Sequence, residues 1–140
     1  MANTLWMRLR KVRWENYKAS ASSKKKIPTM LEGLASRKEA RAMRASHELW
    51  VALCQDGIQS AAEPCLPFLI EIIGISKPHV QGEILDLITQ FARVPDHEPA
   101  SDLQTRLLTS IREQQACFQK LRNSHDDIIA AKASQLVSLL

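Results

Sequence analysis

The chain has 140 residues, 45% of them apolar and 24% charged, an ordinary globular composition that suffices for one domain with a buried core. No apolar run reaches the roughly 18 residues that a membrane-spanning helix needs, and the longest, residues 65–75, is too short. With four glycines, little β-branched alternation and many helix-forming residues, the sequence predicts one all-α domain over residues 1–140.

Charge is distributed unevenly along the chain. Residues 1–44 hold twelve Lys or Arg against three Asp or Glu, a net of +9, and residues 45–140 hold seven against twelve, a net of −5, which together give +4. Such asymmetry is typical of a protein that meets an acidic protein surface, nucleic acid or an anionic membrane. The alternative is a solvated basic segment that pairs with the acidic body of the same chain.

Cys54, Cys65 and Cys117 are an odd number without secreted-type spacing, which predicts free, buried thiols in a reducing compartment. The first 26 residues are rich in Arg and Ser but contain no continuous apolar stretch of the kind found in a secretory signal. We therefore expect a cytoplasmic protein.

Helical periodicity and capping residues divide the chain into segments. A basic N-terminal helix over 4–19 and a polar linker over 19–26 come first, followed by a short helix over 28–34. Ser36 and Ser60, each with Glu three residues later, predict the starts of a helix to about Gln55 and of a nearly all-apolar central helix that ends at Gly74. Further helices are predicted from 76 to about 93, from Ser101 through Phe118, and from Ser124 to the last residue, with a loop over 94–100.

Helix pairs recur about every 40 residues, which is the period of HEAT and armadillo repeats. The sequence thus predicts a short α-solenoid, a HEAT/armadillo-like stack of helix pairs. A compact helical bundle is the structural alternative.

Four segments carry a resemblance to a known group: IPTMLEGL at 27–34, HELW at 47–50, LCQDG at 53–57 and PFLIE at 67–71. They resemble bacterial HEAT-repeat-like proteins in which a helix ending in LW…L-(C/V)-H-Q-G is followed by Y-x-A-(S/T) and A-(L/V)-P-F-L. Trp14, Tyr17 and the Ile27-Pro28 pair echo an upstream W…Y…I-P pattern of that group, while Asp56 and Gln59-Ser60 depart from it. Some members look like immunity proteins of secreted bacterial toxins, so the resemblance implies a protein that binds and neutralises a toxin.

No catalytic or cofactor motif is present. The four histidines have no metal-ligand spacing, and no Walker loop, GxGxxG or G-x-S-x-G occurs. Only Asp96, His97 and Glu98 cluster, in a loop where solvation is the simpler interpretation. We expect no catalysis, no metal and no cofactor.

Binding is therefore the predicted activity, and the basic third holds its candidate residues. They are Trp14, Tyr17, Lys24, Lys25, Lys26, Arg37 and Arg41. The leading hypothesis is a protein partner, specifically a secreted toxin. The alternatives are nucleic acid, because aromatics interleaved with cations can stack on bases, and a scaffold or regulatory fragment. Amphipathic packing of the aromatics, with the cations facing water, would explain the same pattern without any ligand.

Overall fold

The computed structural model describes residues 2–20, 26–93 and 100–140, with side chains from Leu5 onward. These residues form helices and no strand, so the all-α prediction is confirmed. The elements are α1 (Ala2–Lys11), the 3₁₀ helix η1 (Trp14–Asn16), α2 (Ile27–Leu34), α3 (Glu39–Leu53), α4 (Ala62–Ile73), α5 (Pro78–Ala92), α6 (Asp102–Glu113), α7 (Gln115–Arg122) and α8 (Asp127–Ser138).

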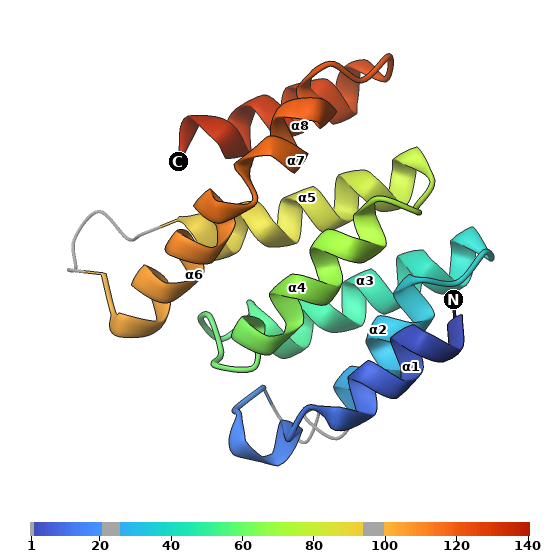
Figure 1. The fold of residues 1–140 in the computed structure, drawn as a ribbon, viewed down its shortest axis with the longest axis vertical. Helices are drawn as coiled ribbons and strands as arrows, with labels where there is room; N and C mark the ends of the chain where they lie inside the picture. The colour runs from blue at the N-terminus through green and yellow to red at the C-terminus, as the bar shows by residue number, and fades with distance from the viewer. Residues whose placement is uncertain (1, 21–25, 94–99) are drawn as a thin grey trace.

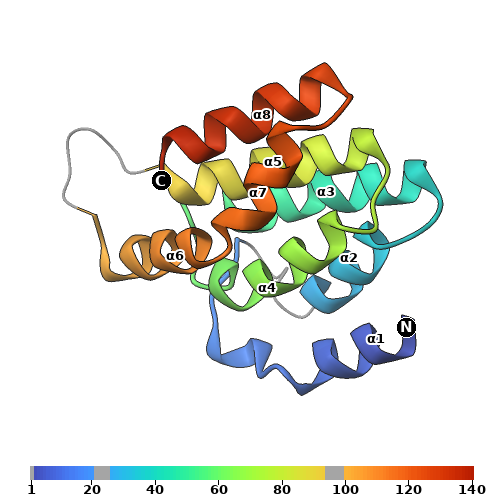
Figure 2. The same cartoon turned by 45° about the horizontal axis from the view of Figure 1, so that its top comes forward.

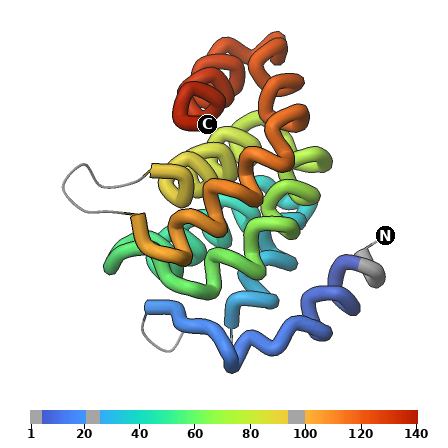
Figure 3. Tube along the Cα trace, turned by 60° about the vertical axis from the view of Figure 1, so that its left-hand side comes forward, coloured from blue at the N-terminus to red at the C-terminus, as the bar shows by residue number. Residues whose placement is uncertain are grey.

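Helices that follow each other in the chain pack as antiparallel pairs, and the helices stand in two rows (Figures 1 and 2). Helix α2 packs on α3, α4 on α5 and α7 on α8. Helices α3, α5 and α8 contact one another in sequence and form the inner row, whereas α2, α4 and α6 form the outer row. Figure 3 shows the resulting order from another side, with α1 at one end of the molecule and α8 at the other.

One apolar core joins all of these helices. Phe68, Leu69, Ile72, Ile84 and Phe91 are buried in it together. The most central helix, however, is α5 rather than α4: it contacts α3, α4, α6 and α8, and nine of its fifteen residues are buried. Helix α4 is apolar on most sides for a different reason: it lies in the outer row, and α1 covers its outer side, where Arg8 contacts Glu71 and Phe68.

The N-terminal segment departs from the predicted helix over 4–19. Helix α1 ends at Lys11, and the buried Trp14 donates its indole N–H to the Leu9 carbonyl at 2.8 Å. The last carbonyls of a helix lack partners within it, so the indole satisfies one of them, and the chain must turn to bring it there.

Residues 18–20, which we name the N-terminal strap, then bind the connection between α3 and α4. The amide of Lys18 donates to the Ser60 hydroxyl at 2.7 Å, and its carbonyl accepts from the Ala61 amide at 2.9 Å. The amide of Ser20 donates to the Ala52 carbonyl at 2.8 Å. The start of the predicted linker is therefore fixed in place, whereas residues 21–25 lie outside the described part of the chain.

Two of the predicted caps are wrong, and tertiary contacts explain why. The Ser60 hydroxyl accepts from the strap, so it caps no helix, and α4 has Ala61 at its N-cap. The Ser36 hydroxyl accepts from the Lys38 amide at 3.1 Å in a local turn, and α3 begins only after Lys38. The predicted end of this helix near Gln55 is close to the observed end of α3 at Leu53. Gly57, in the turn that follows, has a φ of +92°, a left-handed conformation that favours glycine.

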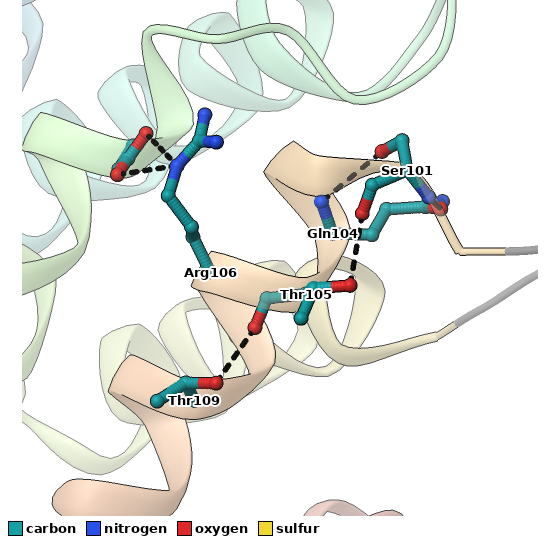
Figure 4. Close-up of polar contacts among 6 residues, drawn as sticks. Ser101, Gln104, Thr105, Arg106 and Thr109 are labelled. Carbon is teal, nitrogen blue, oxygen red and sulfur yellow. Dashed lines mark hydrogen bonds and ion pairs between the residues drawn. The ribbon is translucent and has the colours of Figure 1, made fainter.

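The Ser101 cap is confirmed (Figure 4). Its hydroxyl accepts from the Gln104 amide at 3.1 Å, and the Gln104 side chain accepts from the Ser101 amide at 2.9 Å. The helix predicted from Ser101 through Phe118 is nevertheless two helices, α6 and α7, separated at Gln114. This break lets α6 stay against α4 and α5 while α7 turns to pack on α8.

The last helix begins at Asp127, and its N-cap is Asp126 rather than Ser124. The Asp126 carboxylate accepts from the amides of Ile128 at 3.0 Å and Ile129 at 3.1 Å, and the Ser124 hydroxyl accepts from Asp126 itself. A carboxylate at this position satisfies two unpaired amides and suits the helix dipole.

Leu69→Ala should lower the free energy of unfolding by about 2–5 kcal/mol, because Leu69 is fully buried and the truncation leaves a cavity. Met7→Ala is the control, since Met7 is exposed on α1. Urea unfolding followed by circular dichroism measures both, and a loss for Leu69→Ala as small as that of the control would contradict the assigned core.

Two helical glycines should respond oppositely to alanine. A Cβ on Gly33 would lie 3.2 Å from the Cβ of Ala45, so α2 and α3 would have to separate, and we expect a loss of about 1 kcal/mol. A Cβ on Gly82 would meet only ordinary contacts with Lys132 and Ile129, so the higher helix propensity of alanine should stabilise by about 0.5–1 kcal/mol. Chemical denaturation of both variants would refute this packing if Gly33→Ala proved the more stable.

Candidate partner-binding surface

The basic third of the sequence lies in the half of the folded molecule opposite α8. Helix α1 packs on α2 and α2 on α3; in Figure 1, α1 lies at the bottom of the long axis and α2 and α3 lie above it, towards the middle, whereas α8 lies at the top. The charge asymmetry of the sequence is therefore also an asymmetry in space.

Most of these cations are exposed and have no ion pair. Of the twelve in residues 1–44, Lys24 and Lys25 lie outside the described residues, and Arg8 pairs with Glu71 of α4 at 2.5 Å. The other nine are exposed, and no described carboxylate lies within 4.0 Å of them; they are Arg10, Lys11, Arg13, Lys18, Lys26, Arg37, Lys38, Arg41 and Arg44. We name them the basic end.

Arg8 has a structural role that separates it from this set. Its guanidinium lies 5.9 Å from the centre of the Phe68 ring while it pairs with Glu71, so it fastens α1 to α4. Cation–π and ion-pair contacts at such half-exposed positions contribute modestly, about 0.5–1 kcal/mol each.

The structure separates the residues that the sequence analysis singled out. Trp14 is buried and Tyr17 is half-buried against the core, so their main contacts are with the protein itself. Lys26 precedes α2, and both Arg37 in the α2–α3 turn and Arg41 on α3 are exposed. Lys24 and Lys25 lie in the segment that is not described.

A second surface feature was missed by the sequence analysis. A groove of about 480 Å³ lies along the inner row. It is lined by Ser46, His47, Trp50, Glu83, Asp86, Leu87, Thr89, Gln90, Arg93 and Gln135, from α3, α5 and α8. Trp50 fits the apolar stripe of α3 by its spacing, but its side chain is only half-buried and lines this groove. The signal was present, because His47 and Trp50 are three residues apart, as are Glu83 and Asp86, and so share helix faces.

Contacts between α3 and α5 fix the register of the groove. Glu39 Oε1 lies 2.6 Å from His79 Nδ1, and the Ser46 hydroxyl lies 3.5 Å from Glu83 Oε2. Ser46 follows Glu39 along α3, and Glu83 follows His79 along α5, so the two helices run in the same direction. Trp50, one turn beyond Ser46, is therefore level with Leu87, one turn beyond Glu83.

The two carboxylates of the groove differ in their partners. Asp86 binds the Lys132 ammonium of α8 at 2.8 Å, and the aliphatic part of Lys132 crosses Gly82 on the way. Glu83 has only the long contact with Ser46, and no described cation lies within 4.0 Å of it. The groove thus contains one carboxylate that no cation of the described residues neutralises.

The thiols are poor nucleophiles in this fold. Burial raises the pKa of Cys54 from 9.0 to about 12. The pKa of Cys65 is raised further, mainly by burial and to a smaller extent by the nearby Cys54 thiol. Burial also raises the pKa of the half-buried Cys117, with Lys120 opposing it. A raised folded-state pKa means that the neutral Cys54 thiol stabilises the fold below about pH 9, and that this contribution is lost as the pH rises towards 12.

No family model, curated protein or solved structure matches this chain. Within residues 2–20, 26–93 and 100–140 no three His, Cys, Asp or Glu side chains are grouped so as to hold a metal ion. The predicted cluster of Asp96, His97 and Glu98 falls outside these ranges. No helix in the described part of the chain is both long and apolar enough to cross a bilayer.

Alkylation should distinguish the three cysteines. With iodoacetamide at pH 8, Cys117 should react first, because its thiol is half-buried, whereas Cys54 and Cys65 should react only as fast as the protein unfolds. Mass spectrometry of the cysteine peptides measures the order, and denatured protein, in which all three react alike, is the control. Early modification of Cys65 in the native protein would contradict its burial.

Proposed function

We propose that this chain is a non-catalytic protein-binding module, a short α-solenoid of the HEAT type that captures an acidic protein partner with its basic end. The observation that carries the proposal is the set of nine exposed cations without an ion-pair partner among the described residues. Had the basic segment served only to neutralise the acidic body of the chain, these side chains would meet its carboxylates, and of the described cations of this segment Arg8 alone does so.

The repeated contacts favour a solenoid over a compact bundle. The pairs α2–α3 and α4–α5 each place one helix in the outer row and one in the inner row, and the equivalent helices of the two pairs contact each other; α6 continues the outer row against α4, and α8 continues the inner row against α5. In a compact bundle the first and last helices would come together around one centre, but α1 and α8 lie at opposite ends of the long axis (Figure 1). Solenoids offer extended surfaces suited to binding proteins.

The surroundings of the aromatics favour a protein over nucleic acid. Base stacking requires exposed rings among the cations, yet Trp14 is buried and its N–H is occupied by the Leu9 carbonyl. Glu83 and Asp86 line the groove of the inner row, where they would repel phosphates. Trp14 thus serves packing, and the exposed cations support attraction of an acidic surface.

The resemblance of the four sequence segments supports a more specific form of the proposal. A toxin-immunity protein must capture its toxin quickly inside the producing cell, and complementary charge raises association rates from about 10⁵–10⁶ to as much as 10⁸–10⁹ M⁻¹s⁻¹ at low salt. We therefore propose a secreted bacterial toxin with an acidic contact surface as the partner, bound in the cytoplasm.

Charge reversal tests the proposal. The triple variant Lys26→Glu, Arg37→Glu, Arg41→Glu should associate with the captured partner about tenfold or more slowly at low salt, and the difference should shrink as salt screens the charges. The partner is first isolated from the native source on immobilised protein and identified by mass spectrometry. Association rates are then measured from low to high salt by surface plasmon resonance.

The matched control reverses three exposed cations away from the basic end, Lys77→Glu, Lys120→Glu, Arg122→Glu, which changes the net charge equally. Circular dichroism confirms that both variants fold. Equal slowing by the two variants would show that only net charge matters. If nucleic acid were recovered instead, its affinity fell steeply with salt and the charge-reversed variant lost that salt dependence, the partner would be nucleic acid rather than a protein.

A further inference from the structure

We propose that the groove between α3 and α5 binds the side chain of an arginine on an extended segment of a partner protein, with Trp50 and Glu83 as the recognising residues. This site lies in the inner row and is separate from the basic end. It can be tested whether or not the acidic partner proposed above is correct.

The first step of the argument is the position of Trp50. In an ordinary helical core the indole would be covered, but Trp50 remains half-buried and lines the groove. The register of α3 and α5 places its ring level with Leu87, so that Glu83 and Gln90 flank it, about one turn away on either side. Part of the indole is therefore accessible next to a carboxylate and an amide.

The second step is the charge of Glu83. Its neighbour Asp86 is neutralised by Lys132 at 2.8 Å, but Glu83 has only the Ser46 hydroxyl at 3.5 Å. Arg93 lines the same groove from just beyond the end of α5, ten residues after Glu83, and the two side chains form no ion pair. His47 also lines the groove, from α3, and no contact joins it to Glu83. A half-buried carboxylate in this setting gains most from a cation that enters the groove.

The third step selects arginine among cations. A guanidinium is planar, stacks on an indole face, and donates two parallel hydrogen bonds to one carboxylate. The pairing of a flat aromatic surface with a carboxylate at the next turn matches this shape, whereas an ammonium would use only one of the two features. The amide of Gln90 remains to bind the backbone of the segment.

Indole N–H resonances test the proposal directly, because the chain has three tryptophans that report on different places. The probe is the blocked peptide acetyl-Ala-Ala-Arg-Ala-Ala-amide, about 17 Å long when extended. In ¹H–¹⁵N spectra the Trp50 resonance, assigned with Trp50→Phe, should shift saturably. The Trp14 resonance, whose N–H is bound to Leu9, should not move.

Four comparisons identify the interaction. The same peptide with citrulline, which keeps the shape but lacks the charge, should bind about tenfold more weakly, as should the arginine peptide to Glu83→Gln, because a charge-assisted hydrogen bond is lost. The control Glu48→Gln removes a carboxylate that is exposed on α3 outside the groove and should bind normally. The triple variant of the basic end should also bind the peptide normally.

The proposal is overturned if the citrulline peptide, or one with glutamate, binds as well as the arginine peptide, or if Glu83→Gln binds like the wild type in a folded state. A shift of the Trp6 resonance instead of that of Trp50 would place binding elsewhere. Absence of any shift at about 10 mM peptide, well above a millimolar Kd, would equally refute it.

Discussion

Burial of α5 on nearly all sides is the constraint on which the rest of this structure depends. An amphipathic helix can bury its apolar stripe against one neighbouring helix. Helix α5 buries nine of its fifteen residues, and four neighbouring helices cover them. Its contacts with α3 and α8 create the inner row, and its contacts with α4 and α6 bind the two rows together. The small face that α5 leaves to solvent carries Glu83, Asp86, Gln90 and Arg93, and this is the floor of the groove.

The two surfaces described here arise from different physics. The basic end is a long-range feature, because exposed charges act over about 8–10 Å in physiological salt and need no defined geometry. The groove is a short-range feature, where Trp50 and Glu83 have fixed positions set by the register of two helices. Exposed charges such as those of the basic end speed up the encounter with a partner, whereas a defined groove selects which partner stays bound. One molecule can therefore use both surfaces to bind a partner.

Sequence reasoning succeeded where the signal is local and failed where a distant contact decides. The all-α class, the buried stripe of α5 and the capping box at Ser101 follow from neighbours in the chain. Ser60 carries the same S-x-x-E signature as a cap, yet its hydroxyl is taken by the amide of Lys18, 42 residues away in sequence. Likewise, Trp50 fits a core stripe by periodicity, and only the packing of α5 beside α3 shows that part of its ring faces a groove.

The candidate surfaces show the same division. Exposure of Arg37 and Arg41 follows from their place in a basic, polar stretch, whereas the isolation of Glu83 cannot be seen in the sequence. Glu83 and Asp86 are near-equivalent by periodicity, and it is Lys132 on α8 that distinguishes them by reaching only one.

The N-terminal strap links charge to folding in a way that bears on how this protein can be dissected. Its backbone is bonded to Ala52 and Ala61, and the residues before it supply Leu5, Leu9 and Trp14 to the core. Deleting the first 26 residues would therefore uncover the outer faces of α2 and α4 at the same time as it removed five of the nine cations of the basic end. If the truncated protein no longer bound its partner, the result would not show whether charge or folding was responsible. A homologue without these charges would still need the apolar side chains that lie beneath them.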